Sequence, residues 1–203
     1  MDNVEEISSW IENHSKEVVE SIEQESINVY NFLRREFEKS NVTENHLFQF
    51  VYRSFYRIDN AGLTTEFKKE YFKILEEYRH KENFDFHDVL TRLNLFHNLK
   101  GHKTLQFSFA TKMLNMIDDS MPIYDSKVTK MFSFSRPYQS DFQIKLDKYL
   151  EQFEVIKNGY NQIAEQNLLS KTFKLIEQNF PDSNLSKMKK MDFIFWSAGK
   201  IKS

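Results

Sequence analysis

The chain has 203 residues, 40% of them hydrophobic, with twenty phenylalanines and a formal net charge of -2. This composition supports a sizeable buried core and excludes a disordered chain. The chain contains no cysteine, which excludes disulfides, thiolate metal sites and a cysteine-bound iron-sulfur cluster. Only four glycines and three prolines interrupt it, so we predict an all-α fold rather than a turn-rich β fold.

Charge is distributed unevenly along the chain. Residues 1–40 contain ten acidic and four basic side chains, whereas the remaining 163 residues contain twenty acidic and twenty-four basic ones. The later part could bind a polyanion, but this excess is small beside the basic face of a non-specific DNA-binding protein. The first residues lack the basic and apolar parts of a signal peptide, and no segment approaches eighteen uncharged apolar residues. We therefore expect a cytoplasmic protein without a membrane partner.

Apolar residues at three- and four-residue spacings predict helices along most of the chain. Residues 3–39 predict one long helix or two consecutive helices with an acidic outer face. The next segment, 43–58, is apolar nearly all round and is expected at the centre of the core. Two amphipathic helices follow, capped by Thr64 or Thr65 and by Asp85. Residues 97–106, with one glycine, predict a turn or hairpin.

Pro122 and the residues before it separate two further helices. The first runs from about Ser108 to Ile117, and the second begins near Asp125. The methionines of this region lie at helical spacing beside aromatic residues, which favours gap-filling core positions over a cofactor site. They are Met113, Met116 and Met121.

Three helical segments complete the chain, at 140–158, 160–180 and 184–200. Asn184 is the predicted cap of the last helix. We expect the face of this helix that carries Phe193 and Trp196 to be buried, and Lys189 and Lys190 to remain exposed.

No internal repeat or clear linker is present, so we predict a single helical domain over residues 1–203. The candidate for an internal division into two helical halves is 133–140. The six histidines include no pair at helical i, i+3 or i, i+4 spacing and no HExxH motif, so we predict no metal site. No glycine-rich nucleotide-binding loop and no GxSxG motif occurs.

Two short motifs carry candidate chemistry. "FATKML" (109–114) contains Lys112, and "PIYDSKV" (122–128) contains Asp125. A lysine amine can attack a sugar C1′ while a carboxylate deprotonates it and stabilises positive charge on the sugar. Equally, aspartate is a preferred helix N-cap, and a lysine can cover the core with its stem while its amine stays in water. The residues by themselves leave both alternatives open.

These motifs resemble those of the helix-hairpin-helix DNA glycosylases, the superfamily that includes endonuclease III and the 8-oxoguanine glycosylases. In that family a hairpin of the type LPGVGxKTA opens the helix with the catalytic lysine, and VDTHV or VDVH supplies the catalytic aspartate. Lys112 and Asp125 match these positions. The chain is most similar to uncharacterised bacterial members with ATK, PIYDS and a terminal DxxxWxxGK, the last being "MDFIFWSAGK" (191–200) here.

The resemblance implies a helix-hairpin-helix glycosylase fold and a DNA glycosylase and apurinic lyase that acts on a flipped damaged nucleotide. Lys112 would be the nucleophile and Asp125 the base and stabiliser, both facing one cleft. The absence of cysteine excludes an iron-sulfur cluster, and we expect no cofactor. Double-stranded DNA would be the partner. The residues expected to contact it are Ser108, Thr111, Ser126, Lys127 and Lys130.

The alternative is a non-enzymatic nucleic-acid- or protein-binding protein that retains this fold. It is favoured by the weak basic charge and by Ser108-Phe109-Ala110, which stands where the family has hairpin glycines. A cleft lined by Lys112, Lys127 and Lys130 would favour DNA. A buried Lys112 that is paired elsewhere would favour a structural role.

Overall fold

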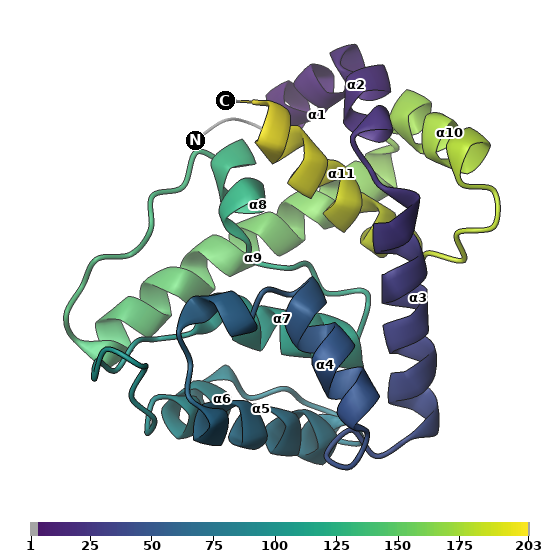
Figure 1. Cartoon of the computed structure of the whole chain (residues 1–203). Helices are drawn as coiled ribbons and strands as arrows, with labels where there is room; N and C mark the ends of the chain where they lie inside the picture. Colours follow the sequence, from purple (N-terminus) through teal and green to yellow (C-terminus); the bar gives the residue numbers. More distant parts are fainter. Residues whose placement is uncertain (1–3, 203) are drawn as a thin grey trace. The chain divides into compact units, whose positions relative to one another are not determined.

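The computed structural model describes residues 4–202 and consists of helices joined by loops (Figure 1). These residues form eleven α-helices and one 3-10 turn. They form no β-strand, and Leu63 and Asn98 make an isolated bridge. The all-α prediction is therefore confirmed.

The chain divides into two compact units. Unit 1 comprises Met1–Ile27 and Asp119–Ser203, and unit 2 comprises Asn28–Asp118. The segment 133–140, which we considered as a division, lies inside unit 1, where it joins α8 to α9. The residues before it are packed rather than linker-like, since the ring of Phe132 stacks on that of Phe195.

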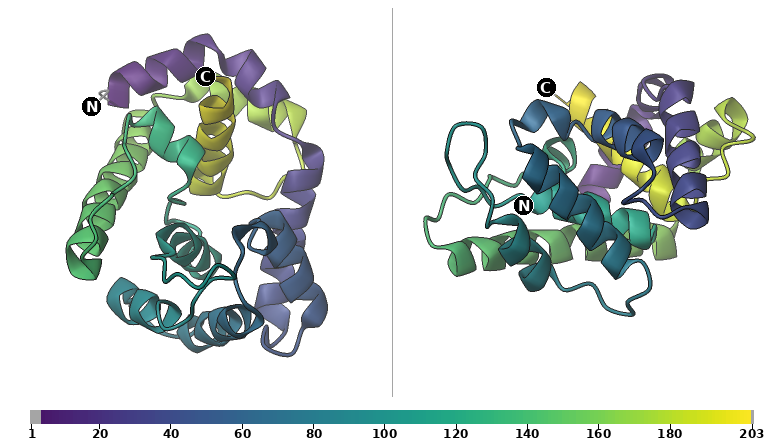
Figure 2. Two further views of the ribbon diagram at one scale, coloured as in Figure 1. Left: turned by 60° about the vertical axis from the view of Figure 1, so that its left-hand side comes forward. Right: turned by 60° about the horizontal axis from the view of Figure 1, so that its bottom comes forward.

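Unit 2 contains α4 to α7, the 3-10 turn and most of α3, whose first residues belong to unit 1. In Figure 2 its blue and teal helices pack side by side. As predicted, Thr64 and Asp85 cap α5 and α6, because their side chains accept hydrogen bonds from backbone amides of the first turn. The elements are α3 (Gln24–Lys39), α4 (His46–Phe55), η1 (Asp59–Ala61), α5 (Thr65–Tyr78), α6 (Phe86–Leu93) and α7 (Phe107–Ile117).

Helix α4 is buried on one face only, which corrects the prediction that it lies at the centre of the core. Phe48 and Tyr52 are fully buried, but Leu47 and Phe50 are 61% and 60% exposed. The buried face packs its rings against Phe72 of α5. The apolar residues on the opposite face of this ten-residue helix meet no such layer, a difference that composition cannot reveal.

Unit 1 contains the remaining helices. Residues 3–39, predicted as one or two helices, form three, since α1 ends before His14 and α2 before Ser21. At both breaks a side chain bonds to the backbone of the preceding turn, His14 Nδ1 to the Trp10 carbonyl and Ser21 Oγ to that of Val18. The helices are α1 (Val4–Asn13), α2 (Ser15–Glu20), α8 (Ser126–Met131), α9 (Phe142–Gln166), α10 (Ser170–Asn179) and α11 (Lys187–Ile201).

Helix α9 continues through Gly159, where we expected a break between two helices. It ends at Asn167, which adopts the left-handed conformation with φ 52°. A Cβ atom at Gly159 would lie 3.0 Å from Cε1 of Phe132 and 3.3 Å from Cγ2 of Val4. This glycine therefore permits close packing inside a helix rather than ending it.

Helix α11 buries a different face from the one we predicted. Its cap is Ser186, whose side chain accepts from the Lys189 amide, and not Asn184. Phe193 and Trp196 are only half-buried, whereas Lys189, predicted to be exposed, is 3% exposed. The buried ring is Phe195, which packs on Phe132 and Tyr160. The prediction failed because the buried ring belongs to Phe195, which lies between the two residues we chose.

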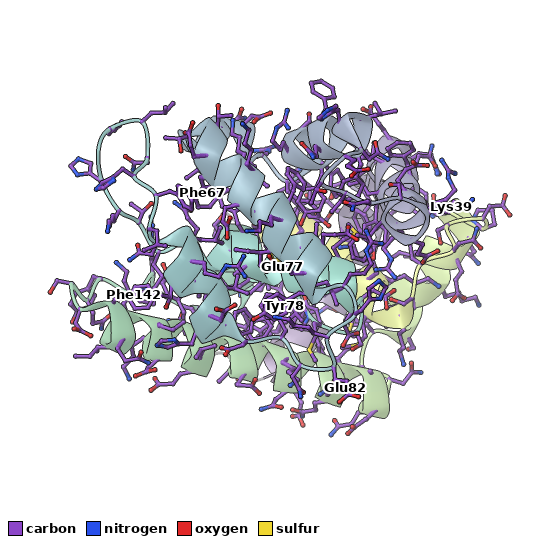
Figure 3. All side chains as sticks on the ribbon, turned by 90° about the horizontal axis from the view of Figure 1, so that it is seen from below. Lys39, Phe67, Glu77, Tyr78, Glu82 and Phe142 are labelled. Carbon is purple, nitrogen blue, oxygen red and sulfur yellow. The ribbon has the colours of Figure 1, made fainter. Side chains whose placement is uncertain are left out.

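A carboxylate on α5 connects this helix to the loop that follows α3. In Figure 3, Phe67 and Tyr78 mark the two ends of α5. Glu76 Oε2 accepts from the Val42 amide at 2.9 Å and from Arg79 Nη2 at 2.7 Å. Arg79 also donates to the Ser40 carbonyl at 2.9 Å. Burial by itself raises the pKa of Glu76, but the Arg79 and Val42 hydrogen bonds outweigh it and hold the pKa below its usual range.

This lowered pKa predicts a loss of stability in acid. Because the folded state releases its proton more readily than the unfolded chain, the contribution of Glu76 is complete above the unfolded value of 4.5 and disappears as the pH falls through the folded one. Urea unfolding between about pH 7 and about pH 3 should show a shallower acid decline for Glu76→Gln than for the parent. Parallel declines would contradict the assigned role.

Candidate functional site

Lys112 lies in the second turn of α7 and is 8% exposed. Its Nζ donates to Ser108 Oγ at 3.0 Å and lies 5.0 Å from the ring centroid of Phe109. Thr111 is buried, and its hydroxyl donates to the Ser108 carbonyl at 3.0 Å. The structure therefore brings Ser108, Thr111 and Lys112 together at the start of one helix. The Lys112 side chain is therefore largely buried, which differs from an exposed lysine with only its stem buried.

A chain of buried tyrosines holds the start of α7. The hydroxyls of Tyr52 and Tyr71 lie 2.8 Å apart, and the Tyr71 hydroxyl donates to the Phe109 carbonyl at 2.8 Å. Burial raises the pKa of both hydroxyls, so both stay neutral. Farther along α7, Arg34 donates to the Met116 carbonyl. Because Phe109 is three residues before Lys112, this network fixes the turn that carries the amine.

Asp125 is the N-cap of α8. Its Oδ1 atom accepts from the Lys127 amide at 2.9 Å, which confirms that the residue acts as a cap. Asp125 and Lys127 are half-buried, and Ser126 and Lys130 are exposed. Four of the predicted site residues thus gather in one short helix of unit 1. A cap and a catalytic carboxylate can coexist at one position.

Helix α11 fixes the segment that carries Asp125. Asp192 Oδ1 accepts from the Ile123 amide at 3.1 Å, just before the cap. Just after the cap, the backbone of Lys127 lies against Gly199, where a Cβ atom would be 2.1 Å from the Lys127 carbonyl oxygen. The segment is therefore held on both sides of Asp125. Asp192 and Gly199 of "MDFIFWSAGK" thus hold the segment of "PIYDSKV" that carries Asp125.

A buried charge cluster surrounds the Asp192 carboxylate. Lys189 Nζ lies 3.4 Å from Asp192 Oδ2, and both side chains are almost fully buried. Burial raises the pKa of Asp192, although Lys189 and the Ile123 amide oppose this shift. Burial, Asp192 and, to a smaller extent, Asp125 raise the pKa of Tyr160, whose hydroxyl does not complete a hydrogen bond of normal geometry. The cluster keeps a lysine and a carboxylate out of water beneath the Asp125 segment.

The two predicted catalytic residues belong to different units, Lys112 to unit 2 and Asp125 to unit 1. That both face one cleft therefore stays a prediction. Sequence reasoning missed Asp192, Lys189 and Tyr160 as an interacting set. Two signals could have found it, the i, i+3 spacing of Lys189 and Asp192 in a largely apolar helix and a glycine inside that helix.

Neither metal ligation nor membrane crossing finds a structural basis in residues 4–202. No group of three or more histidine, aspartate or glutamate side chains gathers there in a way that could hold a metal ion. No helix of this part of the chain is long and apolar enough to span a membrane.

Comparisons with protein-family models, with characterised proteins and with solved structures found no match to this chain.

Proposed function

We propose that the chain is a DNA glycosylase-like protein with apurinic lyase activity and a helix-hairpin-helix glycosylase fold. The observation that carries this proposal is the placement of Lys112. Its amine donates a 3.0 Å hydrogen bond to Ser108 Oγ at the start of a helix that the Tyr52 and Tyr71 pair holds. An amine oriented by such a bond loses little freedom on reaching its target, which favours nucleophilic attack.

The proposed step uses Lys112 and Asp125 in different roles. The Lys112 nitrogen forms a bond to C1′ of the flipped nucleotide while the bond between C1′ and the base breaks. The base leaves with the electron pair of that bond, and the Asp125 carboxylate takes the proton that the attacking nitrogen loses. Its negative charge also stabilises the positive charge that develops on the sugar.

Borohydride trapping tests this proposal, because it reduces the Schiff base to a stable covalent complex. The substrates are duplexes that contain an abasic site, uracil, 8-oxoguanine or an alkylated base. We expect the parent to be trapped on the abasic duplex and Lys112→Met to lose the product. Lys69→Met, an exposed lysine of the same unit, serves as the control and should be trapped like the parent. Asp125→Asn should slow base release yet allow trapping on the preformed abasic site.

Two results would end the lyase proposal. One is the absence of a covalent product from every duplex, and the other is undiminished trapping of Lys112→Met. A variant that no longer folds is recognised by its circular dichroism, and Lys112→Arg then replaces it, since arginine keeps the charge and much of the length but is not a nucleophile at neutral pH.

A specific observation favours a second candidate, a non-enzymatic binding protein of the same fold. Lys112 is buried, which is the arrangement expected for a structural role. This candidate predicts salt-sensitive duplex binding without a covalent product, and Lys112→Met should then lower stability rather than an activity.

A further inference from the structure

A pocket opens in unit 1 between the end of α9, one face of α10 and the start of α11. It has a volume of about 370 Å³, and its lining residues come from all three segments. Pockets of about 300–1,000 Å³ are typical of sites for small organic molecules. None of the lining residues takes part in the step proposed for Lys112 and Asp125. The pocket is therefore a candidate for a separate binding site.

The lining of this pocket is positively charged. Lys174, Lys187 and Lys190 contribute three amines, and Glu177 is the acidic residue of the lining. Lys190 Nζ lies 3.1 Å from Glu177 Oε1, so these two charges balance each other. Within the described part of the chain, no acidic side chain pairs with the amine of Lys174 or of Lys187. Two positive charges therefore remain unbalanced in the pocket.

The Lys187 amine is oriented beside an aromatic ring. Its Nζ donates to the Ala164 carbonyl, near the end of α9, at 2.8 Å and lies 5.6 Å from the ring centroid of Phe173. The carbonyl takes one of the three donors of the ammonium group, so two remain for a ligand. Phe173 is mostly buried and gives the pocket an apolar wall. A ligand bound to Lys187 would thus have a ring surface next to its charged group.

We propose that this pocket binds a small phosphomonoester that carries a ring. The phosphate contacts Lys174 and Lys187, and the ring packs on Phe173. A phosphomonoester carries a charge of about -1.5 to -2 at pH 7, which matches the two unbalanced lysines. The hydroxyl of Ser170 is a further donor in the same lining. Ser170 and Lys187 are the first residues of α10 and α11, so the positive ends of both helix dipoles add to the attraction.

The backbone phosphate of a nucleic acid has similar oxygen atoms and is the competing source. A phosphodiester carries only about one negative charge, which leaves one of the two lysines unmatched. Its two ester groups also continue as polymer on both sides, whereas a pocket of about 370 Å³ has room for one terminal phosphate and its ring. Charge and size therefore favour a small monoester.

An amide NMR titration of the whole chain tests the proposal, because it gives both the affinity and the place of binding. The probes are phenyl phosphate, inorganic phosphate and dimethyl phosphate, which stands for the backbone diester. The titration is done at about pH 8, where the monoester is a dianion because its second pKa is about 6. We expect phenyl phosphate to shift the pocket amides saturably and to bind about 10-fold more tightly than dimethyl phosphate, the effect of one charge-assisted hydrogen bond.

Substitutions of the charged residues separate binding from a structural role. Lys174→Gln should weaken the binding of phenyl phosphate by about 10-fold. The matched control is Lys171→Gln, which should bind like the parent, because Lys171 is exposed on the same helix and does not line the pocket. Glu177→Gln removes a negative charge and keeps an acceptor for Lys190, so it should tighten binding by about 2- to 5-fold, the range of an exposed charge pair.

Phe173→Leu tests the contact with the ring of the ligand. Leucine keeps the position apolar but removes the aromatic face. We expect the parent to prefer phenyl phosphate to inorganic phosphate and the variant to bind the two equally. An equal affinity of the parent for these two probes would contradict the assigned role of Phe173.

Three results would overturn the phosphomonoester site. The first is the absence of a saturable shift with phenyl phosphate up to about 10 mM, ten times a Kd of about 1 mM. The second is equal affinity for dimethyl phosphate, which would identify a contact to a nucleic-acid backbone. The third is undiminished binding by Lys174→Gln. None of them bears on the proposed function, which borohydride trapping at Lys112 tests separately.

Discussion

Gly199→Ala should destabilise the protein by about 1–3 kcal/mol, although alanine is the better helix former by about 1 kcal/mol. The added Cβ would lie 2.1 Å from the Lys127 carbonyl oxygen and 2.9 Å from the Lys127 Cα. Both are backbone atoms, so a side-chain rotation cannot remove the overlap and α8 itself must move. Equilibrium urea unfolding measures the change, and Gly199→Val should cost more because its side chain is larger.

Gly159→Ala is the matched control for this substitution. It also adds a methyl group to a glycine inside a helix of unit 1, but the atoms it approaches most closely belong to the Phe132 ring, at 3.0 Å, and to the Val4 side chain. Side chains can shift by a few tenths of an ångström, so we expect the helix propensity of alanine to offset most of the cost. If Gly199→Ala proves as stable as Gly159→Ala or the parent, α8 does not lie on α11 as described.

Asp192→Asn should destabilise the protein by about 3–5 kcal/mol, because it leaves the buried Lys189 amine without its carboxylate partner. The amide oxygen of asparagine can still accept from the Ile123 amide, so the substitution keeps this hydrogen bond and removes only the negative charge. Combining it with Lys189→Met removes both charges, and we expect the double variant to recover a large part of the stability. Thermal unfolding of the four proteins gives the coupling energy, and additive losses would contradict the pairing.

The raised pKa of Asp192 gives this pair a definite pH dependence. An acid whose folded pKa lies above its unfolded value near 3.9 binds more protons in the folded state, so its contribution to stability decreases as the pH rises through that window. Lys189→Met removes the positive charge that opposes the rise in the pKa of Asp192. The substitution should therefore raise this pKa further and extend the pH window upward. The variant should therefore be closer to the parent at pH 5 than at pH 8.

Local signals predicted much of the fold. Thr64, Asp85 and Asp125 cap helices because each requires only its own side chain and the next amides, all adjacent in sequence. Gly159 was misread as a helix break for a non-local reason. The space beside it is filled by the side chains of Phe132 and Val4, which are distant in sequence. The error about α4 has the same origin, because the composition of this helix does not show which of its faces packs against α5.

Sequence reasoning identified some residues of the candidate site and missed the contacts that hold them. The sequence indicated Lys112 and Asp125 through their motifs, and the structure adds what holds each of them. Tyr71 reaches the Phe109 carbonyl from 38 residues away, and Asp192 reaches the Ile123 amide from 69 residues away. Such bonds between side chain and distant backbone have no periodic signature. Burial of Lys189 was likewise hidden, because lysine in a basic run is usually exposed.

The position of the trapped lysine tests the proposed chemistry most directly. After borohydride reduction on the abasic duplex, the protein is digested with trypsin and the modified peptide is identified by mass spectrometry. A substituted amine at Lys112 blocks cleavage there, so we predict one peptide that spans residues 104–127 and carries the sugar adduct at Lys112, in place of separate peptides 104–112 and 113–127. An adduct at another lysine, with normal cleavage after Lys112, would contradict the assignment of Lys112 as the nucleophile.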